Sequence, residues 1–218
     1  MRRLTGIIVM AAAVSAAGCL QKETTHTIYL TPDGKASWMA VEKDVRSDEQ
    51  APARRLSEEQ QYILAAQAGE HGVARGLAAL SPTRLRTRII RDERPFVVVT
   101  EAEFSSIEFA AQRIVTGLGL PADVLVIYDG PVTTLRVRID VAQAVENEKE
   151  TPEGDQENPI GELAEDLDRY RFVLTAGRFV HATGFRLADN NTAAVPIEPP
   201  RDAIAANGGI LELSLSWQ

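Results

Sequence analysis

Alternation of apolar and polar residues marks strands along most of this chain. In residues 210–217 every second side chain is Leu or Trp, and in residues 83–91 arginines alternate with Leu, Thr and Ile. A period of two residues is the pattern of a half-buried strand. The same pattern, together with short apolar runs, predicts further strands at residues 26–30, 35–45, 96–100, 124–128, 132–141, 169–174 and 178–187.

Two connections between these strands have the composition of tight turns. Pro32-Asp33-Gly34 and Asp129-Gly130-Pro131 each lie between two apolar runs. Proline presets φ, and glycine adopts positive φ at little cost. We therefore expect hairpins around both turns.

The first of two principal helices is expected to start at Ser57. Ser57 and Gln60 have the spacing of a capping box, and the apolar residues after them share one helical face. Gly69, Gly72 and Gly76 interrupt the pattern. They predict either two shorter helices or close packing on a sheet.

The second helix has the clearest start signal in the chain. Ser105 and Glu108 form a capping box, and Phe104 and Phe109 have the spacing of a hydrophobic staple. The helix is expected to end near Gly117.

Strands and helices in this order predict an α+β fold, in which two principal α-helices pack on a mostly antiparallel sheet. Residues 146–158 differ in character, because they hold six acids and no large apolar residue. Such a segment cannot bury enough surface to offset its ordering entropy. We predict a single domain over residues 26–218 with an acidic mobile loop at about 142–164.

The first 18 residues have the layout of a secretory signal peptide, with two arginines, an apolar run and small residues. The apolar run from Leu4 to Ala17 is shorter than the about 20 residues that cross a bilayer comfortably. It closes on Ala16-Ala17-Gly18-Cys19, which resembles the lipobox of bacterial lipoproteins, with Ala16 where a Leu is commoner.

That resemblance implies a lipoprotein leader over residues 1–18, acyl chains on Cys19 and a lipidated tether over residues 19–25. Cys19 is the single cysteine, so it cannot form an internal disulfide. In Gram-negative members of the family, Leu20 after the cysteine implies the outer membrane, facing the periplasm. The alternatives are an ordinary leader cut after Ala17 or Gly18, and an uncleaved anchor.

The net charge limits the classes of partner that this chain is expected to bind. The chain carries −8, and removal of Arg2 and Arg3 with the leader gives about −10. Nucleic acid is excluded as an expected partner, because phosphate binding needs a basic surface. The lipid on Cys19 is the expected membrane contact.

Motifs for catalysis, metals and cofactors are missing from the sequence. None of His26, His71 and His181 belongs to an HExxH pattern, and there is no P-loop and no G-x-S-x-G. We expect His71 at an exposed helix surface or a helix end, whereas His26 and His181 lie in strands that could approach one another. We expect no enzyme, no metal and no cofactor.

One charge pattern suggests a binding surface. If two predicted strands are neighbours, five arginines line one sheet face of an otherwise acidic chain: Arg84, Arg86, Arg88, Arg136 and Arg138. Such a face fits an anionic partner, such as a lipid headgroup, a cell-wall polymer or an acidic protein. The alternative is a solvated face paired with neighbouring acids.

These features predict a non-catalytic envelope lipoprotein that binds a protein or polymer partner, or serves a structural role. The alternative is a carrier or sensor of a small apolar ligand, and an unrecognised hydrolase is a third. The order of elements loosely resembles that of LppM-type lipoproteins, which implies no agreed activity.

Overall fold

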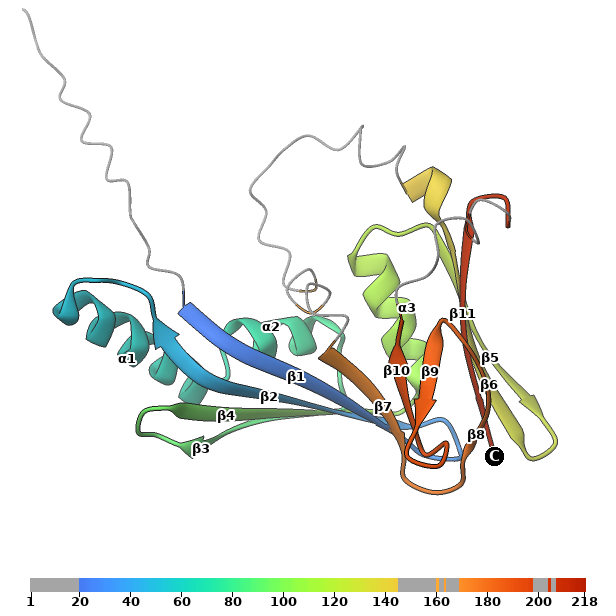
Figure 1. The fold of residues 1–218 in the computed structure, drawn as a ribbon, viewed down its shortest axis with the longest axis horizontal. Helices are drawn as coiled ribbons and strands as arrows, with labels where there is room; N and C mark the ends of the chain where they lie inside the picture. Colours follow the sequence, from blue (N-terminus) through green and yellow to red (C-terminus); the bar gives the residue numbers. More distant parts are fainter. Residues whose placement is uncertain (1–19, 145–159, 161–162, 164–168, 198–203, 205–206) are drawn as a thin grey trace, which may run out of the picture.

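The computed structural model describes residues 20–144, 160, 163, 169–197, 204 and 207–218 (Figure 1). The predicted leader, Cys19 and most of the acidic segment lie outside these residues. The helices are α1 (Pro52–Ala68), α2 (Gly72–Ala79) and α3 (Ile107–Gly117). The strands are β1 (Leu20–Leu30), β2 (Ala36–Ser47), β3 (Arg84–Arg91), β4 (Phe96–Phe104), β5 (Ala122–Asp129), β6 (Val132–Asp140), β7 (Tyr170–Leu174), β8 (Phe179–Thr183), β9 (Phe185–Ala188), β10 (Ala193–Pro196) and β11 (Ile210–Trp217).

The strands form two sheets. The larger has the order β3-β4-β2-β1-β7-β10-β9, and the smaller has the order β5-β6-β11-β8. Every pairing is antiparallel except β1 with β7. The predicted mixture of helices with mostly antiparallel strands is confirmed. The described chain has two sheets instead of one, and besides α1, α2 and α3 it has a helical turn at residues 141–144.

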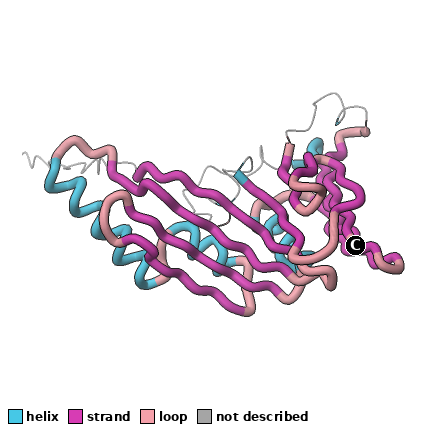
Figure 2. Tube along the Cα trace, turned by 60° about the horizontal axis from the view of Figure 1, so that its bottom comes forward, coloured by secondary structure: helices cyan, strands magenta, loops and turns pink. Residues whose placement is uncertain are grey.

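Helices α1 and α2 pack on one face of the larger sheet, here called the inner face, whereas α3 packs mainly on β5 of the smaller sheet. Figure 2 shows the strands of this sheet in front of the helices, with the opposite face uncovered. Two apolar clusters lie beneath the helices, a small one under α1 that includes Val45, Tyr62 and Val98, and a large one that continues into the smaller sheet. None of the described helices is long and apolar enough to span a membrane.

The glycine-rich region separates two helices, as one of the predicted alternatives had it. Gly69 caps α1 in the left-handed conformation with φ of 71°, and the Glu70 amide donates to the Ala65 carbonyl. The predicted start of α1 at Ser57 is wrong. The helix begins at Pro52, because proline is favoured in the first turn, where its missing N–H costs nothing.

The start of α3 is one residue later than predicted. Ser106, and not Ser105, caps the helix, and its hydroxyl accepts from the amides of Glu108 and Phe109. The predicted end at Gly117 is confirmed.

The predicted tether at residues 19–25 is wrong for its described part. Strand β1 begins at Leu20, which pairs with Ser47 of β2. The half-buried Leu20 side chain packs against the small cluster under α1. A strand partner and contacts with an apolar cluster therefore order residues that were predicted to be a tether.

The predicted strand at 178–187 is two strands in different sheets. β8 pairs with β11 in the smaller sheet, and β9 pairs with β10 in the larger one. Gly184 separates them with φ of +76°, a conformation that glycine adopts without strain. One residue thus carries the chain from one sheet to the other.

The acidic loop predicted at 142–164 is anchored near its end. Ile160 and Leu163 are 7% and 2% exposed and belong to the large apolar cluster. The prediction of mobility is wrong at these two positions, where apolar side chains find a core. Residues 145–159 lie outside the described residues.

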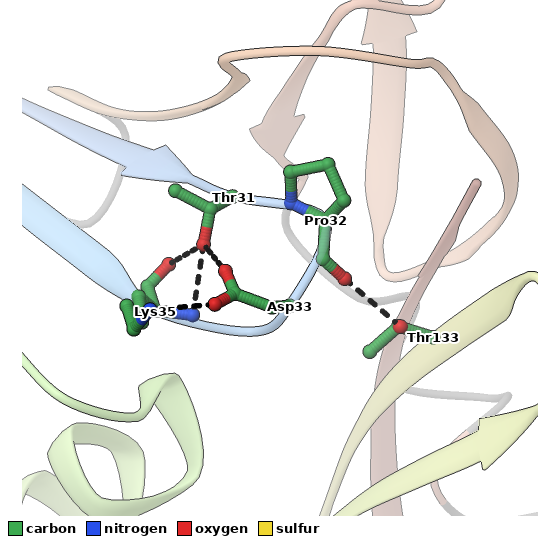
Figure 3. A network of polar contacts seen from close by, with 5 residues as sticks. All are labelled: Thr31, Pro32, Asp33, Lys35 and Thr133. Atoms are coloured by element: carbon green, nitrogen blue, oxygen red, sulfur yellow. Dashed lines mark hydrogen bonds and ion pairs between the residues drawn. The ribbon is translucent and has the colours of Figure 1, made fainter.

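The β1–β2 turn joins the two sheets. Thr31, Asp33 and Lys35 form a polar network within the turn, and the Thr133 hydroxyl of β6 donates to the Pro32 carbonyl at 3.2 Å (Figure 3). The Ile107 amide at the start of α3 donates to the Gly34 carbonyl at 2.8 Å. The turn predicted from Pro32-Asp33-Gly34 therefore also fixes α3 and the smaller sheet.

Replacing Gly34 by alanine is expected to destabilise the protein by about 1 to 2 kcal/mol. Gly34 has φ of +80°, and an added Cβ would lie 3.0 Å from the Tyr128 hydroxyl oxygen. The matched control is Gly130→Ala, which has φ of +57° and no neighbour within 4 Å of the added Cβ. Chemical denaturation measures both. Equal losses would show that the contact with Tyr128 contributes nothing.

Candidate functional site

An apolar cavity lies between the two sheets. Its volume is about 600 Å³, within the range of small-molecule sites. Helix α3 lies between one end of the larger sheet and the smaller sheet, and it forms one wall (Figure 1). The three walls carry, among others, Trp38 and Phe104 from the larger sheet, Ile107, Ala110, Ala111, Ile114 and Leu118 from α3, and Leu135, Val137, Ile139, Leu211, Leu213 and Leu215 from the smaller sheet.

The alternating pattern of β6 and β11 places these side chains on one face. Leu135 pairs with Leu215, Val137 with Leu213 and Ile139 with Leu211. Leu215 is fully buried, whereas the pairs toward the other end of the strands are only partly buried. The cavity therefore deepens toward Leu215 and is more accessible near Ile139 and Leu211.

Small residues keep space between the walls. Ala36, Ala110 and Ala111 face the cavity, where longer side chains would fill it. Position 184 also requires a glycine, since an added Cβ would lie 2.3 Å from a methyl carbon of Leu213. The hollow thus depends on particular small side chains.

Polar atoms on the cavity wall are few and mostly engaged within the protein. Trp38 Nε1 donates to His26 Nδ1 at 3.0 Å, and the Tyr170 hydroxyl donates to the Leu163 carbonyl. Ser214 is the remaining hydroxyl among the lining residues of the described chain. A ligand in this space would make mainly apolar contacts.

His26 lies behind the cavity wall as a neutral ring. It stacks on Tyr170 with 4.5 Å between ring centroids and is 2% exposed. Burial lowers its pKa from 6.5 to about 4, against the opposing effect of Glu42. A neutral ring whose Nδ1 accepts from Trp38 carries its proton on Nε2. His26 thereby holds two of the aromatic wall residues in place.

A separate polar cluster lies under α1 and α2. Glu42 is 1% exposed, and its carboxylate oxygens lie 2.7 Å from Lys22 Nζ and 2.9 Å from His71 Nε2. Burial raises the pKa of Glu42, but hydrogen bonding from His71 and the charge of Lys22 outweigh it, so the pKa stays below its usual value. Burial, followed by the charge of Glu42, raises the pKa of Tyr62 well above its usual range. No member of this cluster lines the cavity.

The histidines do not form a joint site. His71 is 4% exposed, so its predicted place on an exposed helix surface is wrong, although it does lie at the end of α2 as the N-cap residue. His26 and His181 lie in different sheets. Among the residues that the structure describes, no three His, Cys, Asp or Glu side chains are grouped to hold a metal.

The five predicted arginines are not brought together. Arg84, Arg86 and Arg88 lie on β3 of the larger sheet, whereas Arg136 and Arg138 lie on β6 of the smaller sheet. The condition for one shared patch, neighbouring strands, is therefore not met. Arg84 pairs with Glu103 at 3.5 Å, Arg88 with Glu101 at 2.6 Å, and Arg138 with Glu212 at 3.7 Å.

Comparisons with known proteins add little. No protein-family model matches the chain, and no curated protein matches its sequence. The NMR structure of the folded domain of LppM from Mycobacterium tuberculosis aligns over 92% of this chain and 91% of that chain, with 9% identity and a TM-score of 0.37. The resemblance in layout thus has a weak structural counterpart.

Proposed function

We propose that this protein is a lipid-anchored envelope protein that binds an apolar ligand, such as an acyl chain, between its two sheets. The observation that carries the proposal is the cavity of about 600 Å³ with almost wholly apolar walls. Protein interiors are normally close-packed, and pockets with mostly apolar walls are typical sites for small molecules. This favours the ligand carrier over the partner-binding module that the sequence suggested first.

The composition of residues 146–158 favours a separate ligand, and not this segment of the chain, as the occupant of the cavity. The acidic segment that follows the smaller sheet's β6 holds no large apolar residue between 146 and 158, so it offers no side chain to match an apolar wall. The cavity wall of the described chain also presents no His and no acid beside Ser214, which supports binding over hydrolysis.

The location remains part of the proposal. We place the mature chain at a bacterial outer membrane, facing the periplasm, held by acyl chains on Cys19. Two or more chains give stable anchoring, because each buried methylene contributes about 0.8 kcal/mol. Intact-mass spectrometry of protein from the native host tests this. A free Cys19 thiol or an uncut leader would refute the anchoring.

Filling the cavity is expected to abolish ligand binding without unfolding the protein. Val137→Trp adds an indole to the cavity wall, and we expect the affinity for 11-(dansylamino)undecanoic acid to fall by more than about tenfold, a loss above about 1.4 kcal/mol. Dansyl emission on titration measures binding, and palmitate should displace the probe.

The matched control is Leu125→Trp on the adjacent strand β5. Leu125 is 44% exposed and lies outside the cavity lining, so its replacement should leave the affinity unchanged. Equal affinity in the Val137→Trp variant, or no probe binding by the unaltered protein, would refute the proposed function.

A further inference from the structure

The outer face of the larger sheet, opposite the helices, is uncovered in the described chain. In β1 and β2 the inward residues are buried, and the alternate residues are partly exposed. Figure 2 shows this bare face toward the viewer. The residues of this face pair directly across neighbouring strands, in the order β3, β4, β2, β1 and β7. They form three rows: Arg88-Val99-Val41-Thr25, Arg86-Glu101-Met39-Thr27-Arg171 and Arg84-Glu103-Ser37-Tyr29-Val173.

These rows have an apolar middle and a basic rim. Met39, Val41 and Val99 lie at the centre of the face, and the three β3 arginines lie along its edge. Together with Arg171, four arginines on these rows oppose two glutamates, in a chain whose net charge is −8. Three of the four arginines pair with acids, Arg84 with Glu103, Arg88 with Glu101 and Arg171 with Asp189. Their side chains are still 63%, 42% and 46% exposed, so they remain at the surface of this face.

The chain enters the sheet without a spacer. Leu20 pairs with Ser47 and packs under α1, so the body is ordered from the residue after Cys19. Adjacent Cα atoms are about 3.8 Å apart. A body attached so closely cannot stand away from the bilayer, and one of its surfaces has to lie against it.

We infer that the outer face of the larger sheet lies on an anionic bilayer, with the β3 arginines and Arg171 among the headgroups and Met39 and Val41 toward the interface. Arginine binds lipid phosphate through paired N–H donors, and the aliphatic part of its side chain packs beside apolar side chains at an interface. This inference rests on the proposed anchoring at Cys19. It does not depend on what the cavity binds.

The test places a fluorophore on each side of the sheet. The lipidated protein carries bimane on a new thiol at Thr27→Cys on the outer face, or at Gln61→Cys on the exposed side of α1. Acylation occupies the thiol of Cys19, the single cysteine of the chain, so the introduced thiol is the one that bimane labels. In phosphatidylcholine vesicles containing phosphatidylglycerol and brominated lipid, we expect quenching at position 27 to exceed that at 61 several-fold.

Charge variants test the arginines. Arg86→Glu with Arg88→Glu should remove the quenching at position 27. The matched control is Arg54→Glu with Arg55→Glu, because these arginines lie on α1, on the other side of the sheet. Each pair of substitutions breaks one ion pair, Arg54 with Glu49 in the control and Arg88 with Glu101 on β3. This control pair should leave the quenching unchanged. The milder Arg86→Gln with Arg88→Gln gives the same comparison if the reversals impair folding.

Quenching that is equal at the two positions, stronger at 61, or unaffected by the β3 substitutions would overturn the inference, and an acidic protein partner would then be the better occupant of this face. Intact mass reports the acylation of Cys19, and dansyl-probe binding reports the cavity. Failure of either is therefore distinguishable from failure of the bilayer contact.

Discussion

Replacing Glu42 by glutamine is expected to lower the free energy of unfolding by about 3 kcal/mol, the largest effect that we predict for a single substitution. The carboxylate is 1% exposed and lies between Lys22 and His71. Removing its charge leaves the half-buried Lys22 ammonium without its counterion. Lys22 is 28% exposed and partly hydrated, which places the loss at the lower end of the range for broken buried pairs.

Urea denaturation measures this loss, and Glu101→Gln is its control. Glu101 also pairs with a base, Arg88, but both side chains are more than a third exposed, so its replacement should cost less than about 1 kcal/mol. Similar losses for Glu42→Gln and Glu101→Gln would show that the buried cluster is energetically unimportant.

Acid is expected to destabilise the protein between pH 6.5 and about 4 through His26. The unfolded chain binds a proton at this ring below pH 6.5, whereas the folded chain does so only near pH 4, because burial lowers the pKa. The stability contributed by His26 is complete above pH 6.5 and is lost as the pH falls to about 4. The loss amounts to about 3 kcal/mol, since one pKa unit corresponds to about 1.4 kcal/mol.

The variant His26→Phe separates this effect from other titrations. It should remove the fall between pH 6.5 and 4, at a constant cost of about 1 to 3 kcal/mol because the Trp38 N–H loses its acceptor. The acid loss that remains should lie below about pH 4.5, where Glu42, whose folded pKa is lowered, contributes stability that protonation removes. Denaturation midpoints across this pH range test the prediction. A fall between pH 6.5 and 4 of the same size in both proteins would assign it to other groups.

Local patterns predicted most of the elements, because they depend on residues close in sequence. The turn at Pro32-Asp33-Gly34 and the strand at 210–217 are both present. The errors occur where distant contacts decide. Leu20 is ordered by β2 and α1, and the strand at 178–187 divides because Gly184 turns the chain into another sheet.

The candidate site was harder to predict from the sequence than the secondary structure was. The alternation in β6 and β11 showed that Val137 and Leu213 face inward, but it could not show that the opposite wall stands far enough away to leave a hollow. Ala110 and Ala111 on one helix face were a usable signal of that space. The buried pair of Glu42 and His71 joins residues that are 29 positions apart. It depends on where α2 packs on the sheet, which no local sequence pattern indicates.

The passage of the chain between sheets at Gly184 limits how the cavity can change shape. Gly184 joins β8 to β9 across the seam, and the contact of Thr133 with Pro32 pins the seam near the start of β6. These two joins connect the sheets directly, so the sheets cannot move independently of each other at these points. Ile139 and Leu211 lie at the other end of the paired strands β6 and β11 and are only partly buried, so this end is where the ligand that we propose would enter the cavity.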